Sequence, residues 1–282
     1  MVFSGSSSID LVKGSYDLSR RANLYHLHGL SFREYLNFFH DIDQPAMSFS
    51  DLIAHPEEYA SSISSIPKLL GHFEDYLARG YYPYVEVDML SYYEKIHQTI
   101  DKAIYQDIAN FYQLKTQNLV YFKRILNFLA SIPPGEISVN NLAKNLQIDN
   151  KTVHSYLEIL AEIAMIRIVT VPEGGNKLLR LPTKIFIENT TLLTALNHYL
   201  GENLSIGTVR ELFFIQSVVN AKLPLFYSTI GDYVVDNHYF EIGGKNKDRS
   251  QLKGKDNAYI VKDGILHPSY HTLPLYLFGF LY

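Results

Sequence analysis

The chain has 282 residues, 47% hydrophobic and 19% charged, a composition typical of a globular protein with two or three domains. Its formal net charge of −4 gives no global attraction to nucleic acid or to an anionic membrane, and the absence of cysteine excludes disulfides and thiolate metal sites. No signal peptide is recognisable and no run reaches the roughly 18 apolar residues of a membrane span, so we expect a cytoplasmic protein without a membrane partner.

Residues 1–8 predict a short buried strand that runs into a serine-rich turn. Chain ends usually lie at the surface, whereas a buried strand is normally flanked by other strands of a parallel sheet. We therefore expect the chain to begin within a fold whose remaining strands come from elsewhere.

Residues 31–113 predict mainly helices. Ser31 and Glu34 have the S-x-x-E spacing of a capping box, which predicts a helix start. Residues 66–79 form a second amphipathic segment, which Gly-Tyr-Tyr-Pro at 80–83 ends, and residues 92–111 carry apolar side chains at helical spacing.

Residues 119–171 carry the clearest supersecondary pattern. A helix over 120–132 ends at Pro-Pro-Gly, and Ser138 and Asp149 cap two further helices that end at residues 146 and 165. A strand at 167–171 is then expected to pair with one at 177–181. This order is typical of a winged helix-turn-helix.

The C-terminal region mixes strands and helices, which makes the predicted fold class mixed α/β and multidomain. The expected helices cover 190–200 and 208–220, and the expected strands lie at 184–187, 225–229, 232–236, 238–242 and 257–261. The apolar residues 273–282 predict a buried final strand.

Several short motifs together carry a resemblance to a known family. They are Ser-Gly-Ser-Ser at 4–7, Leu-Ser-Phe-Arg-Glu at 30–34, Gly-Tyr-Tyr-Pro at 80–83, Phe-Glu-Ile-Gly-Gly-Lys at 240–245 and Gly-Phe-Leu-Tyr at 279–282. With them the chain resembles the C-terminal part of a group of prokaryotic AAA+ P-loop ATPases. The resemblance implies that Ser4 and Ser6 sense the nucleotide and that Arg21 reaches a neighbour's γ-phosphate. The alternatives are a serine-rich turn and an ion pair on a helix.

The phosphate-binding motif G-x-x-x-x-G-K-[ST] does not occur in the 282 residues. We therefore expect no cofactor in this chain alone, and ATP with Mg²⁺ only if a separate P-loop ATPase chain completes it. A split or truncated gene is a further explanation of the pattern.

The last domain resembles the PD-(D/E)XK restriction-endonuclease fold. The resemblance places Glu211, Asp232 and Glu241 as metal-binding carboxylates and a lysine two residues after Glu241 as the group that assists the attacking water. Residue 243 is glycine, and the first lysine stands at 245. Lys245 could reach that place only through a bulge at the two glycines, so we expect clustered carboxylates without cleavage activity.

The predicted recognition helix offers Lys151, Thr152 and His154 for contacts with nucleic acid. Residues 117–172 hold five basic and four acidic side chains, a net charge of +1, which is low for binding that depends on neutralising phosphates. The helix pair is therefore equally suited to docking another protein. The histidines show no spacing typical of a zinc site.

We predict a remnant of an AAA+ core over 1–30, a helical, lid-like region over 31–116, a winged helix over 117–182 and a nuclease-like α/β domain over 183–282. The predicted function is binding or regulation without ATP hydrolysis by this chain alone. A DNA-binding winged-helix regulator and a metal-dependent nuclease are the alternatives.

Overall fold

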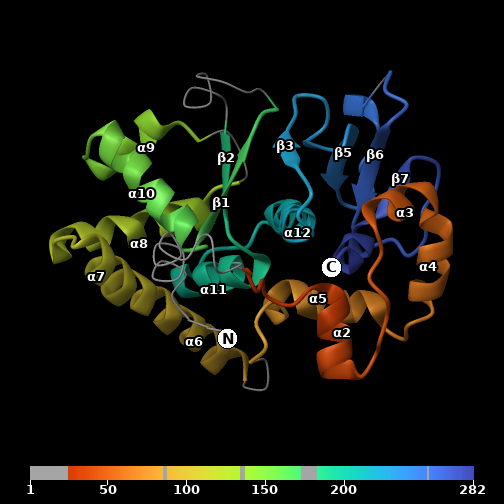
Figure 1. The fold of residues 1–282 in the computed structure, drawn as a ribbon, viewed down its shortest axis with the longest axis horizontal. Helices are drawn as coiled ribbons and strands as arrows, with labels where there is room; N and C mark the ends of the chain where they lie inside the picture. Colours follow the sequence, from red (N-terminus) through yellow and green to blue (C-terminus); the bar gives the residue numbers. More distant parts are fainter. Residues whose placement is uncertain (1–24, 85–87, 134–136, 173–182, 253) are drawn as a thin grey trace, which may run out of the picture.

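The computed structural model describes residues 25–84, 88–133, 137–172, 183–252 and 254–282. Over these residues it contains eleven α-helices and two β-sheets, which confirms the mixed α/β class (Figure 1). Ser4, Ser6 and Arg21, with the strand expected at 1–8, lie outside the described residues.

The first four described helices are α2 (Phe32–His40), α3 (Phe49–Ala54), α4 (Pro56–Ser64) and α5 (Leu69–Arg79). The capping box is confirmed, since the Glu34 N–H donates to Ser31 Oγ and the Ser31 N–H donates to Glu34 Oε2 at 2.8 Å. These helices pack against the C-terminal end of the chain. The Phe32 and Phe280 rings lie 5.7 Å apart, and the Met47 N–H donates to the Phe280 carbonyl at 2.9 Å.

The helix expected over 92–111 is continuous but not uniform. Helix α6 (Met89–Lys102) passes through a π-helical stretch at Ala103–Ile108 into α7 (Ala109–Tyr112), which ends at Gln113 with a φ of 51°. Helix α8 (Thr116–Ser131) follows and packs back against this stretch.

Two short capped helices and a hairpin come next. Helices α9 (Val139–Leu146) and α10 (Asn150–Glu162) begin after their predicted caps, Ser138 and Asp149. Strand β1 (Ile166–Thr170) pairs antiparallel with β2 (Thr183–Ile187) along its whole length. The strand expected at 177–181 lies outside the described residues, and the partner that the structure shows for β1 is β2.

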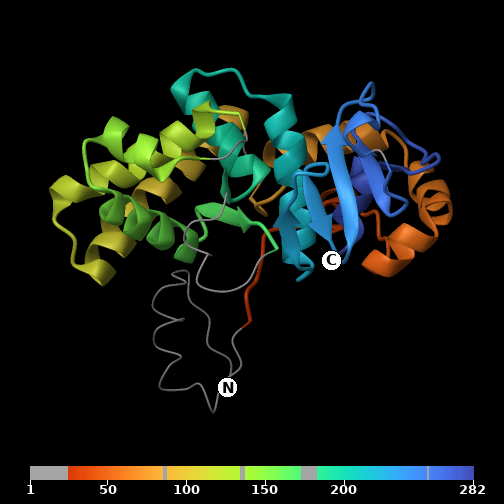
Figure 2. The ribbon, with the colours of Figure 1, turned by 90° about the horizontal axis from the view of Figure 1, so that it is seen from above.

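The larger sheet follows α11 (Thr190–Leu200) and α12 (Ile206–Asn220). Its strands are β3 (Leu225–Tyr227), β4 (Tyr233–Val235), β5 (His238–Gly243), β6 (Ala258–Lys262) and β7 (Thr272–Pro274), in that spatial order. Strand β4 is antiparallel to both β3 and β5, whereas β5, β6 and β7 run parallel to one another. Helix α12 packs beside this sheet (Figure 2).

The final strand expected over 273–282 is wrong beyond β7. A 3₁₀ helix occupies Leu275–Phe280, and all six of its residues are buried. Pro274 begins this turn, and Gly279 allows it to approach α2, because a Cβ at Gly279 would lie 2.5 Å from the Phe32 Cβ. Continuous burial over six residues therefore marks a packed helical turn here, not a buried strand.

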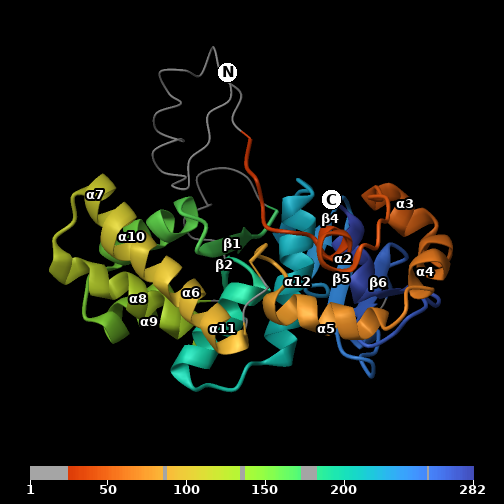
Figure 3. The ribbon, with the colours of Figure 1, turned by 90° about the horizontal axis from the view of Figure 1, so that it is seen from below.

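Buried hydrophobic side chains between Phe32 and Leu281 form one large core, and Leu252, Ala258 and Ile260 form a second, small cluster. Helix α12 lies at its centre, with buried residues around its circumference, as expected for a helix apolar on all sides. Helices α6 to α10 lie at one end of the molecule, and α3, α4 and the larger sheet lie at the other (Figures 1 and 3). Among the described helices, none combines the length and apolarity needed to cross a membrane.

Candidate acidic site on the five-stranded sheet

Three carboxylates meet where α12 lies against strands β4 and β5. Glu211 lies on α12, Asp232 directly precedes β4, and Glu241 lies within β5. The antiparallel pairing brings the last two together, because the Asp232 N–H donates to the Phe240 carbonyl at 2.8 Å. Burial is the main cause of the raised pKa of both glutamates, and the charge of Asp232 adds to it in each case.

Glu211 is held by a tyrosine and a lysine. The Tyr233 hydroxyl donates to Glu211 Oε2 at 2.7 Å, and Lys184 Nζ lies 3.6 Å from the same oxygen. Burial raises the pKa of Glu211 above its usual value, opposed by the charge of Lys184 and the bond from Tyr233. Lys184, which comes from β2, is itself buried, with its Nζ 4.7 Å and 5.2 Å from the ring centroids of Tyr227 and Tyr233.

Glu241 is the most enclosed carboxylate of the three, with a side chain only 1% exposed. Burial raises its pKa, whereas the hydrogen bond from Lys247 and the positive charges of Lys247 and Lys184 act in the opposite direction. Lys247 makes a direct ion pair with Glu241 Oε1. The Gln251 amide, oriented with its nitrogen toward Glu241, donates to Oε1 and Oε2 at 3.0 Å and 2.9 Å.

The lysine of this site is Lys247, not the predicted Lys245. Lys245 is exposed, and its backbone carbonyl accepts a bond from Lys262 Nζ at 3.2 Å. A turn closed by the Lys247 N–H and the Gly244 carbonyl, 3.0 Å apart, returns the chain over β5. The Lys247 side chain then lies across Gly243, where a Cβ would be 2.6 Å from Lys247 Cγ. Lys247 thus fills the face of β5 that Gly243 leaves empty.

The residues around Glu241 do not fit a bound divalent cation in this arrangement. A metal needs oxygen lone pairs that point to a common centre, whereas the Glu241 oxygens already accept bonds from an ammonium and an amide. The carboxylate of Asp232 likewise accepts from the Ile242 N–H at 2.8 Å. Over the described part of the chain, no group of three or more His, Asp or Glu side chains has the geometry of a metal site.

On α10, Lys151 and His154 are exposed, as a contact with nucleic acid would require. Thr152 is committed to the helix start, since its N–H and hydroxyl donate to Asp149 Oδ1 and Oδ2 at 2.9 Å and 2.6 Å. Of the three predicted residues, Lys151 and His154 therefore remain available for a contact.

Three residues of the acidic site were not predicted. For Lys247 a signal existed in the glycine at 243 and the lysines downstream, but the turn that selects residue 247 is not visible in the sequence. Gln251 reaches the site from a 3₁₀ turn, Ser250–Leu252, and Lys184 reaches it from β2. No local pattern marks either of them.

Comparisons with known proteins describe the chain only in outline. Residues 70–205 match a domain of unknown function, DUF8612. Of the residues in the acidic site, Lys184 lies within this match and the others lie beyond it. Uncharacterized protein MJ1637 of Methanocaldococcus jannaschii is 28% identical over 292 aligned residues, which cover 94% of this chain and 60% of that protein. The chain therefore spans less than two thirds of that relative's length. No solved structure matches this chain.

Proposed function

We propose that this chain acts in the cytoplasm by binding or regulation, as the C-terminal half of an AAA+-type ATPase that does not hydrolyse ATP alone. The motifs at 30–34 and 80–83 support this assignment, because both have defined structural roles in the described core. The first forms the capping box of α2, and the second places Tyr81 between the buried polar side chains of Asn220 in α12 and Glu188, which follows β2. Its nucleotide partner would be a separate P-loop chain.

The finer fold assignments rest on the order and pairing of the elements. Helices α8, α9 and α10 followed by the β1–β2 hairpin have the order of a winged helix-turn-helix. Helix α12, the antiparallel strands β3 to β5 and the parallel strand β6 have an order that supports a restriction-endonuclease-like region. Its carboxylates come from α12, the start of β4 and the middle of β5.

The observation that carries a binding role, rather than cleavage, is the closed arrangement around Glu241. Both of its oxygens accept bonds from side chains of this protein, and the ammonium of Lys247 already compensates its charge. Incubation of plasmid and single-stranded DNA with Mg²⁺ or Mn²⁺ should therefore leave both substrates intact.

A metal-dependent nuclease is the second candidate, and Lys247 specifically favours it. A cation close to the attacking water is one requirement of this chemistry. The resemblance expects a lysine at residue 243, and the Lys247 side chain lies over Gly243. Cleavage that is lost in Glu241→Ala and Lys247→Ala, but kept in Lys245→Ala, would establish this candidate and overturn the binding role.

A further inference from the structure

Tyr270 is an exposed tyrosine with aromatic and cationic neighbours. Tyr270 precedes β7 and is 84% exposed, although its ring is large and apolar. The Arg249 guanidinium lies 5.9 Å from the centre of this ring, and the His271 ring lies 4.2 Å from it. The ring is thus flanked by planar groups while most of its surface remains in water.

Arg249 is fixed in place by the backbone. Its Nη2 donates to the carbonyls of Lys255 and Ala258 at 3.3 Å and 3.2 Å. The guanidinium beside Tyr270 therefore belongs to an ordered loop, so it can position a ligand at a lower entropic cost than a free side chain could.

A second tyrosine–cation pair lies next to the first. Lys255 Nζ is 5.2 Å from the centre of the Tyr239 ring, and the Lys255 carbonyl is the group that Arg249 binds. We name Tyr239, Arg249, Lys255 and Tyr270 the tyrosine–cation surface. Arg249 and Lys255 lie in the loop after β5 that also supplies Lys247 and Gln251 to Glu241, and Tyr239 lies two residues before Glu241 in β5.

The local charge of this loop differs from that of the whole chain. Residues 245–256 hold five basic and two acidic side chains, whereas the protein carries a net charge of −4. Lys247 is paired with Glu241. The surface therefore offers a polyanion two local cations, Arg249 and Lys255, together with one exposed aromatic ring, that of Tyr270.

We propose that a single-stranded nucleic acid binds along the tyrosine–cation surface, with a base stacked on Tyr270 and a phosphate near Lys255. Single strands present both base faces and a charged backbone, and aromatic rings with adjacent cations bind both. A duplex keeps its base faces stacked inside, so it would leave the Tyr270 ring without a partner. This inference rests on the proposed binding role and names its partner.

The test is fluorescence anisotropy of a labelled oligodeoxythymidine with the full chain. Tyr270→Ala should weaken binding about tenfold, because one stacked base is lost, whereas Tyr270→Trp should preserve it. Lys255→Gln should reduce the slope of log affinity against log salt by about 0.7, the value for one phosphate contact to a single strand. Tyr25→Ala is the matched control, since Tyr25 is 83% exposed, and it should bind as the unmodified chain does.

The proposal is overturned if the unmodified chain does not bind the probe, if Tyr270→Ala and Tyr25→Ala bind equally, or if unlabelled duplex competes as well as unlabelled single strand. Unchanged melting temperatures would show that both tyrosine variants are folded, as their exposure predicts. A negative result in this binding test would not contradict a role in docking a separate P-loop chain. Micromolar ATP binding would remove the proposed function and leave this surface untouched.

Discussion

Glu241 has almost no contact with solvent, so its charge depends on groups that the protein itself supplies. Lys247 and Gln251 both come from the loop that follows β5, and the charge of Asp232 adds a repulsion. The protonation of Glu241 therefore reports on the position of one loop side chain, Lys247.

Lys247→Ala should raise the pKa of Glu241 further above its usual value, because it removes a hydrogen bond and a positive charge that both lower it. Since the raised pKa favours the neutral form in the folded state, the associated stability is present at low pH and is lost as the pH rises through that pKa. Carbon NMR of the Glu241 carboxyl during a pH titration measures the change. Lys245→Ala is the control and should leave the Glu241 pKa where it was; a shift there would contradict the assignment of Lys247.

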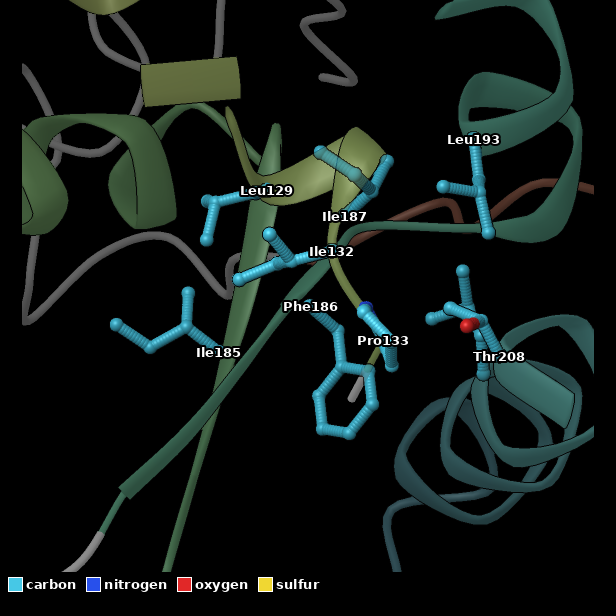
Figure 4. A pocket seen from close by; sticks show the side chains of 9 residues that line it. Leu129, Ile132, Pro133, Ile185, Phe186, Ile187, Leu193 and Thr208 are labelled. Carbon is cyan, nitrogen blue, oxygen red and sulfur yellow. The ribbon is translucent and has the colours of Figure 1, made fainter. Parts of the chain in front are cut away.

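Thr208 is a buried residue whose hydroxyl has no hydrogen-bond partner among the described residues. It faces a cavity of about 10 Å³ together with apolar residues that include Leu129, Ile132 and Phe186 (Figure 4). Thr208→Val keeps the shape and removes the unsatisfied hydroxyl, so it should stabilise the protein by about 1 kcal/mol. Urea unfolding measures this change, and a loss of stability would show instead that a water molecule bridges the hydroxyl in this space.

Helix starts are the elements that the sequence predicts best. Ser31, Ser138 and Asp149 each cap the helix that they precede, because a cap is a local contact between residues three positions apart. The 3₁₀ turn at Leu275–Phe280 was mispredicted, because it depends on packing against α2, which local patterns do not encode. Strand β2 was expected, but its pairing with β1 was not. Glu211, Asp232 and Glu241 were named from motifs, whereas no local pattern marks the turn that brings Lys247 to Glu241 or the contact of Lys184 with Glu211.

Asp149→Ala should destabilise the protein by about 1 kcal/mol, because it leaves N–H groups of the first turn of α10 without their acceptor. Lys151 is an exposed residue two positions further along, so Lys151→Ala should change the free energy of unfolding by no more than about 0.5 kcal/mol. Urea midpoints at constant slope measure both variants. Equal stabilities would mean that the cap contributes nothing and that packing alone fixes the start of α10.

Buried polar groups connect elements from distant parts of the molecule. Arg167 of β1 pairs with Glu188, and both side chains are about nine-tenths buried. Arg167 also donates to Asn220 Oδ1 at 2.8 Å, and Asn220 in turn donates to the hydroxyls of Tyr81 and Tyr282 at 3.3 Å and 2.9 Å. Groups far apart in the sequence therefore depend on one another, which explains why Gly-Tyr-Tyr-Pro at 80–83 and the terminal tyrosine belong to the same core.

Arg167→Ala should cost about 3–5 kcal/mol, because it leaves the Glu188 carboxylate buried without its cation. Arg79→Ala is the matched control, since the Arg79–Asp75 pair has side chains 28% and 36% exposed and should contribute no more than about 1 kcal/mol. Calorimetric unfolding compares the two variants. Similar losses would refute the view that the Arg167–Glu188 pair holds the two ends together.

We propose that this chain works as the C-terminal half of an ATPase and does not use ATP by itself. Isothermal titration calorimetry of the full chain with Mg-ATP tests this proposal, because the P-loop that would hold the phosphates is missing from the 282 residues. We expect no binding at concentrations below about millimolar. A micromolar dissociation constant would contradict the claim, since it would require a nucleotide site built from residues of this chain.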